Sequence, residues 1–289
     1  MIKQPSAGLI FARSKIFLEK DYDNYDGYKD SMIVDMGEFD FRIRGVGDLM
    51  GKKTEWSIPI SAAETAAYFD AELNNHGYAS EQIEIDVAEY AELRGYSIEK
   101  TNRVLDKDIE ILKKIEYREG RGQFAPFYDS VERIRRRQSV KIYFSAAFYD
   151  YLNRNRRFMY LPKSVYRINN QTRPHAYFFG QKIAAHKAMN NKKSNGDILR
   201  VSTIMESSPK MKRTLQLIYD NMENHITRAA YEPFIKNMNA LDGAFSWTLT
   251  ERNGTEVTAE AAMKLPIHKF KELRARIAWK DYPEKDSQK

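Results

Sequence analysis

The stretch from Ile83 to Glu119 constrains the fold more than any other part of the chain, because it has the pattern of two short helices joined by a tight turn. Gly95 can adopt the left-handed conformation that ends a helix, and Ser97 can cap the N-terminus of the next one. Within the second segment, Leu105 and Ile109 lie at helical spacing. The stretch therefore predicts a helix-turn-helix.

The second of these segments carries cations opposite its apolar face. Lys100, Arg103, Lys107 and Lys114 fall roughly opposite Leu105 at about 100° per residue. Any solvated helix can show such a stripe, and residues 81–118 contain ten Asp or Glu against seven Lys or Arg. Taken alone, the stretch favours an ordinary solvated face over a phosphate-binding surface.

Charge is distributed unevenly along the chain. Counting Lys and Arg against Asp and Glu gives a net charge of −7 for residues 1–118, +12 for residues 119–200 and +2 for residues 201–289. Concentrated positive charge attracts a polyanion, and binding then releases counterions. Nucleic acid is the expected partner, and an anionic membrane surface is the alternative.

Length and composition limit the class of protein. The chain has 289 residues, which is enough for two ordinary domains, and it has no cysteine for a disulfide or a thiolate site. Its apolar runs are too short to span a bilayer, and residues 1–20 lack the pattern of a signal peptide. These features favour a cytoplasmic protein.

Two segments partly match ligand-binding loops, and both depart from the required pattern. Residues 21–30 would place Tyr25 and Asp26 where a calcium-binding EF-hand loop needs an oxygen ligand and a glycine. Residues 45–54 place Val46 and Lys53 where a nucleotide-binding loop needs Gly and Ser or Thr. We therefore expect no metal ion and no cofactor.

A β-hairpin with a cationic tip is expected after the helix-turn-helix. Residues 127–135 and 139–144 have strand character and are joined by a basic turn. Such cations can reach phosphates or a minor groove without burying charge. Arginines also protect edge strands from aggregation, but the five cations of residues 133–141, with only Glu132 directly beside them, exceed that purpose. The predicted DNA contacts of this hairpin are Arg133, Arg135, Arg136, Arg137 and Lys141.

The order of predicted elements is that of a winged-helix domain, and it occurs twice. In the first half a helix capped by Ser61 precedes the helix-turn-helix and the hairpin. In the second half a helix follows Pro174, a short strand and helix occupy residues 198–205, and further helices cover residues 210–224 and 226–241. A hairpin around Asn253-Gly254 and a last helix within residues 259–282 complete it.

These patterns predict an α+β fold, mainly α, with two tandem winged-helix (helix-turn-helix plus β-hairpin) domains. The predicted parts are an N-terminal extension with strand character (1–59), the first winged-helix domain (60–156), a connector (157–171), the second winged-helix domain (172–282) and a polar tail (283–289).

Three segments share a pattern of apolar and basic positions with a known family: VAEYAELRGYSIEKTNRVLDKDIEILKKI, SVKIYFSAAFYDYL and RPHAYFFGQKIAAH. Through them the chain resembles the plasmid and mobile-element replication initiator family with two tandem winged-helix domains, over most of residues 60–255. The resemblance implies binding to repeated duplex sites at an origin, a homodimer that represses its own gene, a monomer that opens the origin, and recruitment of host replication proteins. It also implies recognition helices over about residues 97–114 and 227–241.

Two recognition helices joined by one connector can enter successive major grooves of double-stranded DNA, about one turn apart. Asn102, Arg103, Lys107 and Arg228 are the expected contacts to base edges. The other predicted DNA contacts are Lys100, Arg156, Arg157, Lys210, Lys212, Arg213 and Lys236.

Several functions stay open at this point. Sequence-specific duplex DNA binding for replication initiation is favoured, and a transcriptional regulator with the same fold would make the same contacts. A nicking enzyme that uses a tyrosine would need a clustered metal site, and the five histidines show no paired spacing. A membrane-surface protein would need an amphipathic helix with bulky apolar residues opposite its cations. We therefore predict a DNA-binding protein without enzymatic activity.

Overall fold

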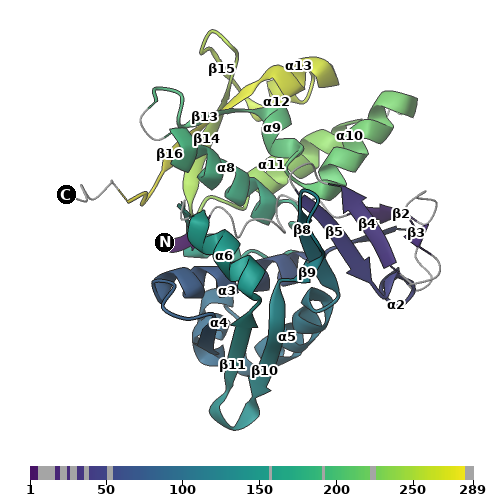
Figure 1. The fold of residues 1–289 in the computed structure, drawn as a ribbon. Helices are drawn as coiled ribbons and strands as arrows, with labels where there is room; N and C mark the ends of the chain where they lie inside the picture. Colours follow the sequence, from purple (N-terminus) through teal and green to yellow (C-terminus); the bar gives the residue numbers. More distant parts are fainter. Residues whose placement is uncertain are drawn as a thin grey trace. The chain divides into compact units, whose positions relative to one another are not determined.

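The computed structural model describes residues 1–5, 17–19, 25–26, 31–35, 39–50, 55–155, 158–190, 193–221 and 226–283. The chain is an α+β protein with small sheets (Figure 1). It divides into two compact units, called here the N-terminal unit (residues 4–157) and the C-terminal unit (residues 1–3 and 158–289). Within the described residues, no helix combines the length and apolar character needed to cross a bilayer.

Helices and a three-stranded antiparallel sheet form the main scaffold of the N-terminal unit. The central strand of this sheet is β11, which pairs with β10 on one side and with β7 on the other. The chain passes through the scaffold in the order α3 (Ile60–Asn75), β7 (Gln82–Asp86), α4 (Val87–Arg94), α5 (Ile98–Leu112), β10 (Tyr128–Ile134), β11 (Ser139–Phe144) and α6 (Ala146–Arg154).

The turn between α4 and α5 forms as predicted. Gly95 has a φ of +64°, and the N–H of Tyr96 donates to the carbonyl of Ala91 at 3.0 Å. The Ser97 hydroxyl accepts from the N–H of Lys100 at 3.2 Å, which caps α5. The helix-turn-helix prediction is confirmed, although the stretch that contains it begins with strand β7.

The predicted cap at Ser61 is wrong. Helix α3 begins at Ile60, after Pro59, so Ser61 already lies in its first turn. The Ser61 hydroxyl donates instead to the carboxylate of Asp108 in α5, at 2.7 Å. A hydroxyl near a helix start can cap its own helix or bind a neighbouring one. The Ser61 hydroxyl binds the buried Asp108 carboxylate of a neighbouring helix.

Residues 1–59, predicted as an extension, contribute strands to the N-terminal unit. Strand β8 follows α5 and pairs with β5, so that strands from before and after the helix-turn-helix lie in one five-stranded sheet. Rings of Phe41 and Tyr117 in these strands lie 6.0 and 4.8 Å from the ring of Phe127, so the sheet and the scaffold share an aromatic core. The sheet has the order β3 (Tyr25–Asp26), β4 (Ser31–Asp35), β5 (Phe39–Arg44), β8 (Ile115–Glu119) and β9 (Ala125–Pro126).

Short elements between residues 17 and 57 complete this unit. The strand character predicted for residues 1–59 is confirmed at β5, whereas residues 6–16 lie outside the described residues. The other elements are β2 (Phe17–Glu19), helix α2 (Val46–Met50) and β6 (Glu55–Ser57), which pairs with β2.

The C-terminal unit is built on a four-stranded sheet with the order β13-β16-β14-β15. The residues predicted as a connector include β12 (Phe158–Leu161), which pairs with β1 (Ile2–Pro5), and helix α7 (Lys163–Tyr166). The further elements in chain order are α8 (Ala176–Asn190), β13 (Ile198–Arg200), α9 (Val201–Met205), α10 (Pro209–Asn221), a π-helix (Thr227–Tyr231), α11 (Glu232–Asn239), β14 (Phe245–Thr250) and β15 (Glu256–Val257).

A single helix predicted within residues 259–282 is wrong. The segment forms α12 (Ala259–Ala262), α13 (Ile267–Glu272) and strand β16 (Arg274–Trp279). Pro266 precedes α13, where its fixed φ suits a helix start but cannot continue a preceding helix. In β16, Ala275 and Ile277 are buried while Arg276 is exposed, which is the period of a strand.

Pro233 explains the irregular start of α11. Proline lacks an N–H, and its ring collides with the carbonyl of the residue four positions earlier in a regular α-helix. The chain accommodates Pro233 by forming a π-helix before it and by placing it in the first turn of α11. The predicted helix of residues 226–241 is therefore two helical segments.

Candidate nucleic-acid interface

The exposed side of α5 carries three cations, which we call the α5 cationic face: Lys100, Arg103 and Lys107. At helical spacing they lie within about 60° of one another, opposite the buried Leu105 and Ile109. The Lys100 ammonium lies 3.5 Å from the centre of the Tyr96 ring, and Arg103 lies 3.9 Å from Glu99 in an exposed ion pair. Exposed pairs of this kind are weak, so the cations can exchange partners.

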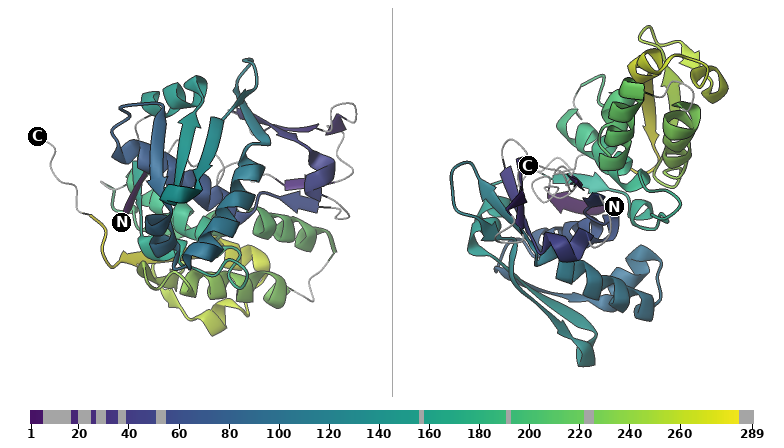
Figure 2. Two further views of the ribbon diagram at one scale, coloured as in Figure 1. Left: turned by 90° about the horizontal axis from the view of Figure 1, so that it is seen from below. Right: turned by 90° about the vertical axis from the view of Figure 1, so that its right-hand side faces the viewer.

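The β10–β11 hairpin places two further cations at its tip, which we call the hairpin tip: Arg136 and Arg137. Both side chains are exposed in a short 3-10 turn, and Gln138 closes the turn with a φ of +49°. In Figure 1 the tip projects beyond α4 and α5, and the right-hand view of Figure 2 shows the hairpin as a long two-stranded ribbon. The predicted hairpin is confirmed by its register.

Arg133 connects the hairpin to α5. Its side chain is only 16% exposed, lies 3.2 Å from the Asp106 carboxylate and donates to the Asn102 side chain. Arg133 and Asn102, both predicted DNA contacts, thus bind one another. Their contact ties β10 to α5, which orients the hairpin tip relative to the α5 cationic face.

Lys141 lies in an acidic setting. Lys141 is part of β11, the central strand of the sheet. Its cross-strand neighbours are Glu132 on β10 and Glu84 on β7. Cross-strand neighbours of opposite charge attract one another, which favours pairing of Lys141 within the sheet. The Arg135 side chain, Arg156 and Arg157 lie outside the described side chains and residues.

A buried polar cluster holds α5 against α3. Asp108 of α5 accepts hydrogen bonds from the hydroxyls of Ser61 and Thr65, each at 2.7 Å, and Thr65 is 2.9 Å from the Tyr90 hydroxyl. Burial raises the pKa of Asp108 to about 6, although both hydrogen bonds act in the opposite direction. These contacts set the position of the helix that carries the α5 cationic face.

A buried ion pair lies in the same interior. The Arg94 guanidinium contacts the carboxylate of Glu64, and the two side chains are 1% and 0% exposed. Arg94 also donates to the hydroxyls of Tyr90 and Tyr96, at 3.3 and 3.2 Å. Each charge therefore has polar partners in a region without water access.

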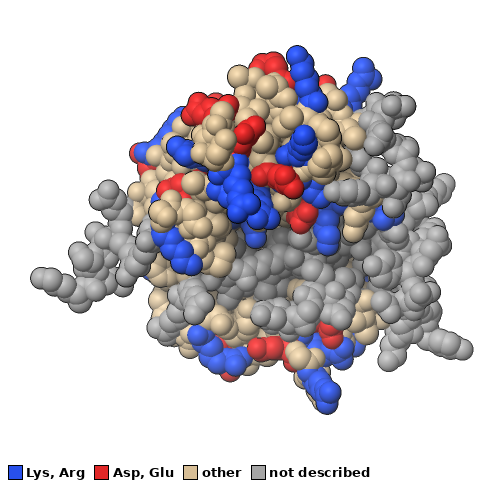
Figure 3. All heavy atoms as spheres, turned by 90° about the horizontal axis from the view of Figure 1, so that it is seen from above, with Lys and Arg blue, Asp and Glu red and all other residues tan. Residues whose placement is uncertain are grey.

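The predicted cations of the C-terminal unit are more dispersed. Lys210 and Lys212 are exposed on α10, Arg213 is half-buried, Arg228 is exposed in the π-helix and Lys236 is exposed on α11. The face drawn in Figure 3 shows Lys and Arg side chains interspersed with Asp and Glu. Ion pairs of the unit include Lys187 with Asp197 at 2.8 Å.

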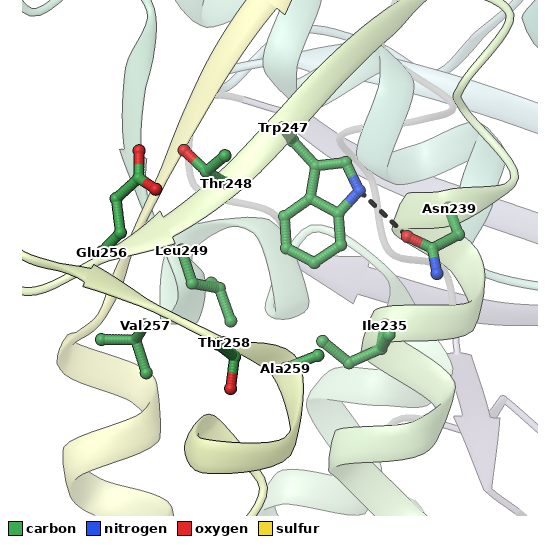
Figure 4. Close-up of a pocket in the computed structure, with 9 residues that line it drawn as sticks. All are labelled: Ile235, Asn239, Trp247, Thr248, Leu249, Glu256, Val257, Thr258 and Ala259. Carbon is green, nitrogen blue, oxygen red and sulfur yellow. Dashed lines mark hydrogen bonds between the residues drawn. The ribbon is translucent and has the colours of Figure 1, made fainter.

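An apolar pocket of about 360 Å³ lies between α11 and the β14–β15 hairpin. Figure 4 shows Ile235, Trp247 and Leu249 around it, with the Trp247 indole N–H donating to the Asn239 side chain at 3.2 Å. The described residues that line it include no Lys or Arg and one acid, Glu256. The helix and hairpin of this unit therefore present a surface unlike that of α5 and β10–β11.

Three arginines absent from the predicted site lie on the solvent side of the C-terminal sheet: Arg200, Arg274 and Arg276. Arg274 and Arg276 were missed because a helix was predicted within residues 259–282. The alternation in the sequence RARIAW is the signal that could have assigned Arg274 and Arg276 to one face of a strand.

Among the residues that the structure describes, no three His, Asp or Glu side chains are grouped so as to hold a metal ion. The Tyr128 hydroxyl and the Asp70 carboxylate are buried without a hydrogen-bond partner among the described residues. Burial raises the pKa of each group well above its ordinary value.

The sequence matches no protein-family model and no curated protein. Among solved structures, the chain is similar to the crystal structure of domains 2 and 3 of RctB, with a TM-score of 0.43 and 10% sequence identity. The alignment covers 94% of this chain and 98% of that one.

Proposed function

We propose that the chain is a sequence-specific duplex DNA-binding protein of two winged-helix domains that acts in replication initiation. The order of elements supports this. A helix, a strand, two helices and two strands follow in α3, β7, α4, α5, β10 and β11, with the last strand between the other two. In the C-terminal unit β16 likewise lies between β13 and β14. Strands β8 and β9 are an insertion between α5 and β10.

The observation that carries the proposal is the arrangement of α5 and the hairpin tip. The α5 cationic face is exposed, and Arg133 ties the helix to the hairpin that bears Arg136 and Arg137. A helix fits the major groove of B-DNA, and a basic hairpin beside it reaches the adjacent backbone or minor groove. Arg103 and Lys107 would then contact base edges, and the hairpin tip would contact phosphates.

Replacing both arginines of the hairpin tip, Arg136→Ala with Arg137→Ala, should weaken binding to every duplex. We expect a loss of about 10- to 100-fold near 50 mM salt, and the slope of log Kd against log salt should fall by about two, because two phosphate contacts are lost. Fluorescence anisotropy with two unrelated duplexes measures both. The matched control is Arg121→Ala with Arg154→Ala, which removes two exposed arginines of the same unit outside α5 and the hairpin.

Replacing Arg103 with alanine should instead reduce discrimination between sites. A guanidinium that binds a guanine edge contributes about 1–3 kcal/mol of discrimination, so the ratio of specific to scrambled affinity should fall by about 5- to 150-fold. Selection of bound genomic fragments supplies the specific site, and competition assays give the ratio. An unchanged ratio would remove Arg103 from the recognition surface. Arg121→Ala serves as the control and should leave the ratio unaltered.

Replication initiation and transcriptional regulation use the same contacts and must be separated genetically. For an initiator, the coding gene should lie beside direct DNA repeats that the protein binds, and loss of the gene should stop replication of that element. A regulator would leave replication intact. The proposal includes a homodimer and host replication proteins as partners, and it includes no catalytic step. Cleavage of supercoiled DNA in magnesium or manganese would contradict that last point.

A further inference from the structure

Two arginines lie side by side on neighbouring strands of the C-terminal sheet. Strands β13 and β16 are antiparallel, and their register places Arg200 directly opposite Arg274. Side chains at opposite positions project from the same face with their Cβ atoms about 4.5–5.5 Å apart, and like charges there repel one another. Arg276 lies two residues along β16 on this same face.

Neither arginine of this pair is neutralised. Within the residues that the structure describes, the side chains of Arg200 and Arg274 have no hydrogen bond and no ion pair. Asp197 is engaged by Lys187 at 2.8 Å and by the Trp279 indole at 2.9 Å. Glu256, the acid in the same row of the sheet, is separated from Arg274 by β14. No acid of the described residues therefore compensates this repulsion.

The two arginines also border a cavity. A pocket of about 430 Å³ is lined by Arg200, Arg274, Thr203, His186 and Asn195 with the apolar Ile198 and Leu199. No acid lines it. The His186 Nε2 lies 3.2 Å from the Asn195 carbonyl and Nδ1 lies 3.3 Å from the Asn190 amide, so the ring is held in place. The lining thus offers two guanidinium groups and a hydroxyl.

We propose that Arg200 and Arg274 form a phosphate-binding site on the solvent face of the C-terminal sheet. Planar guanidinium groups bind phosphate oxygens in pairs, and an anion between them converts their repulsion into attraction. Thr203 supplies a hydroxyl donor, and Arg276 extends the cationic row along β16. In the proposed function the phosphate belongs to the DNA backbone, so this assignment of its source rests on that function.

The test uses the full chain, inorganic triphosphate and isothermal titration calorimetry at constant ionic strength. The variant is Arg200→Gln with Arg274→Gln, and the matched control is Lys269→Gln with Lys280→Gln, which removes two exposed cations of the same unit. We expect binding to the wild-type chain and the control, and at least tenfold weaker binding to the variant. Equal affinity of variant and wild type, or no binding to the wild-type chain, would overturn the site.

Two further measurements identify the phosphate and confirm folding. In duplex titrations, a reduced salt slope for the variant alone assigns the site to the DNA backbone, whereas an unchanged slope with lost triphosphate binding assigns it to a small phosphate-bearing ligand. If the wild-type chain binds triphosphate but no duplex, the proposed function fails and the site persists. The variant should have a Tm equal to or above that of the wild type in phosphate-free buffer, because it loses a repulsive pair.

Discussion

Replacing Arg94 with methionine is expected to lower the free energy of unfolding of the N-terminal unit by about 3–5 kcal/mol, because the substitution leaves Glu64 as an uncompensated buried charge. Both side chains are essentially unexposed, so water cannot take the place of the guanidinium. Urea unfolding followed by circular dichroism measures the loss, and hydrogen exchange of the α4 and α5 amides assigns it to this unit.

Two controls separate this effect from a general loss of charge. Arg103→Ala removes an arginine from the exposed pair with Glu99, and it should cost less than about 1 kcal/mol. The double variant Glu64→Met with Arg94→Met should recover much of the lost stability, because no isolated charge is then buried. A single Arg94→Met variant as stable as the wild type would show that the pair is not buried in solution.

The second large effect is the pH dependence of stability that Asp108 contributes. Burial raises its pKa from 3.8 to about 6, so the folded unit keeps a proton that the unfolded chain loses at lower pH. The resulting stabilisation is complete below about pH 4 and is lost as the pH rises through 6. Over this pH interval the free energy of unfolding of the wild type should therefore fall by about 3 kcal/mol relative to that of Asp108→Asn.

The quantity compared is the difference in free energy of unfolding between the wild type and Asp108→Asn at each pH. Asp70, whose pKa burial also raises, is present in both and cancels from the difference. The groups around Asp108 are Thr65, Ser61, Arg94 and Lys107. Urea titrations at several pH values give the two curves, and parallel curves between pH 4 and 6.5 would show that Asp108 titrates normally.

Local rules were enough to predict the parts of the fold that depend on neighbours in sequence. Gly95 and Ser97 marked the turn of the helix-turn-helix, and Asn253-Gly254 marked the turn between β14 and β15. Exposure of Lys100, Arg103 and Lys107 followed from the helical period that buries Leu105. Each of these features depends on spacing within a few residues.

The missed features depend on residues distant in sequence. Pairing of β5 with β8 joins segments about 75 residues apart, which no local pattern indicates. The contact of Arg133 with Asn102 and the pairing of Arg200 with Arg274 likewise require the register of the folded chain. The RARIAW strand was missed for a different reason, because its apolar residues also fit a helical stripe.

The most direct test of the DNA-binding surface is photocrosslinking of the full chain to a duplex recovered by genomic-fragment selection, with peptide mapping by mass spectrometry. We expect crosslinks within residues 97–112 and 134–141, which are competed by unlabelled specific duplex and weakened by salt. Crosslinks confined to other peptides, or a chain that recovers no duplex at all, would contradict it.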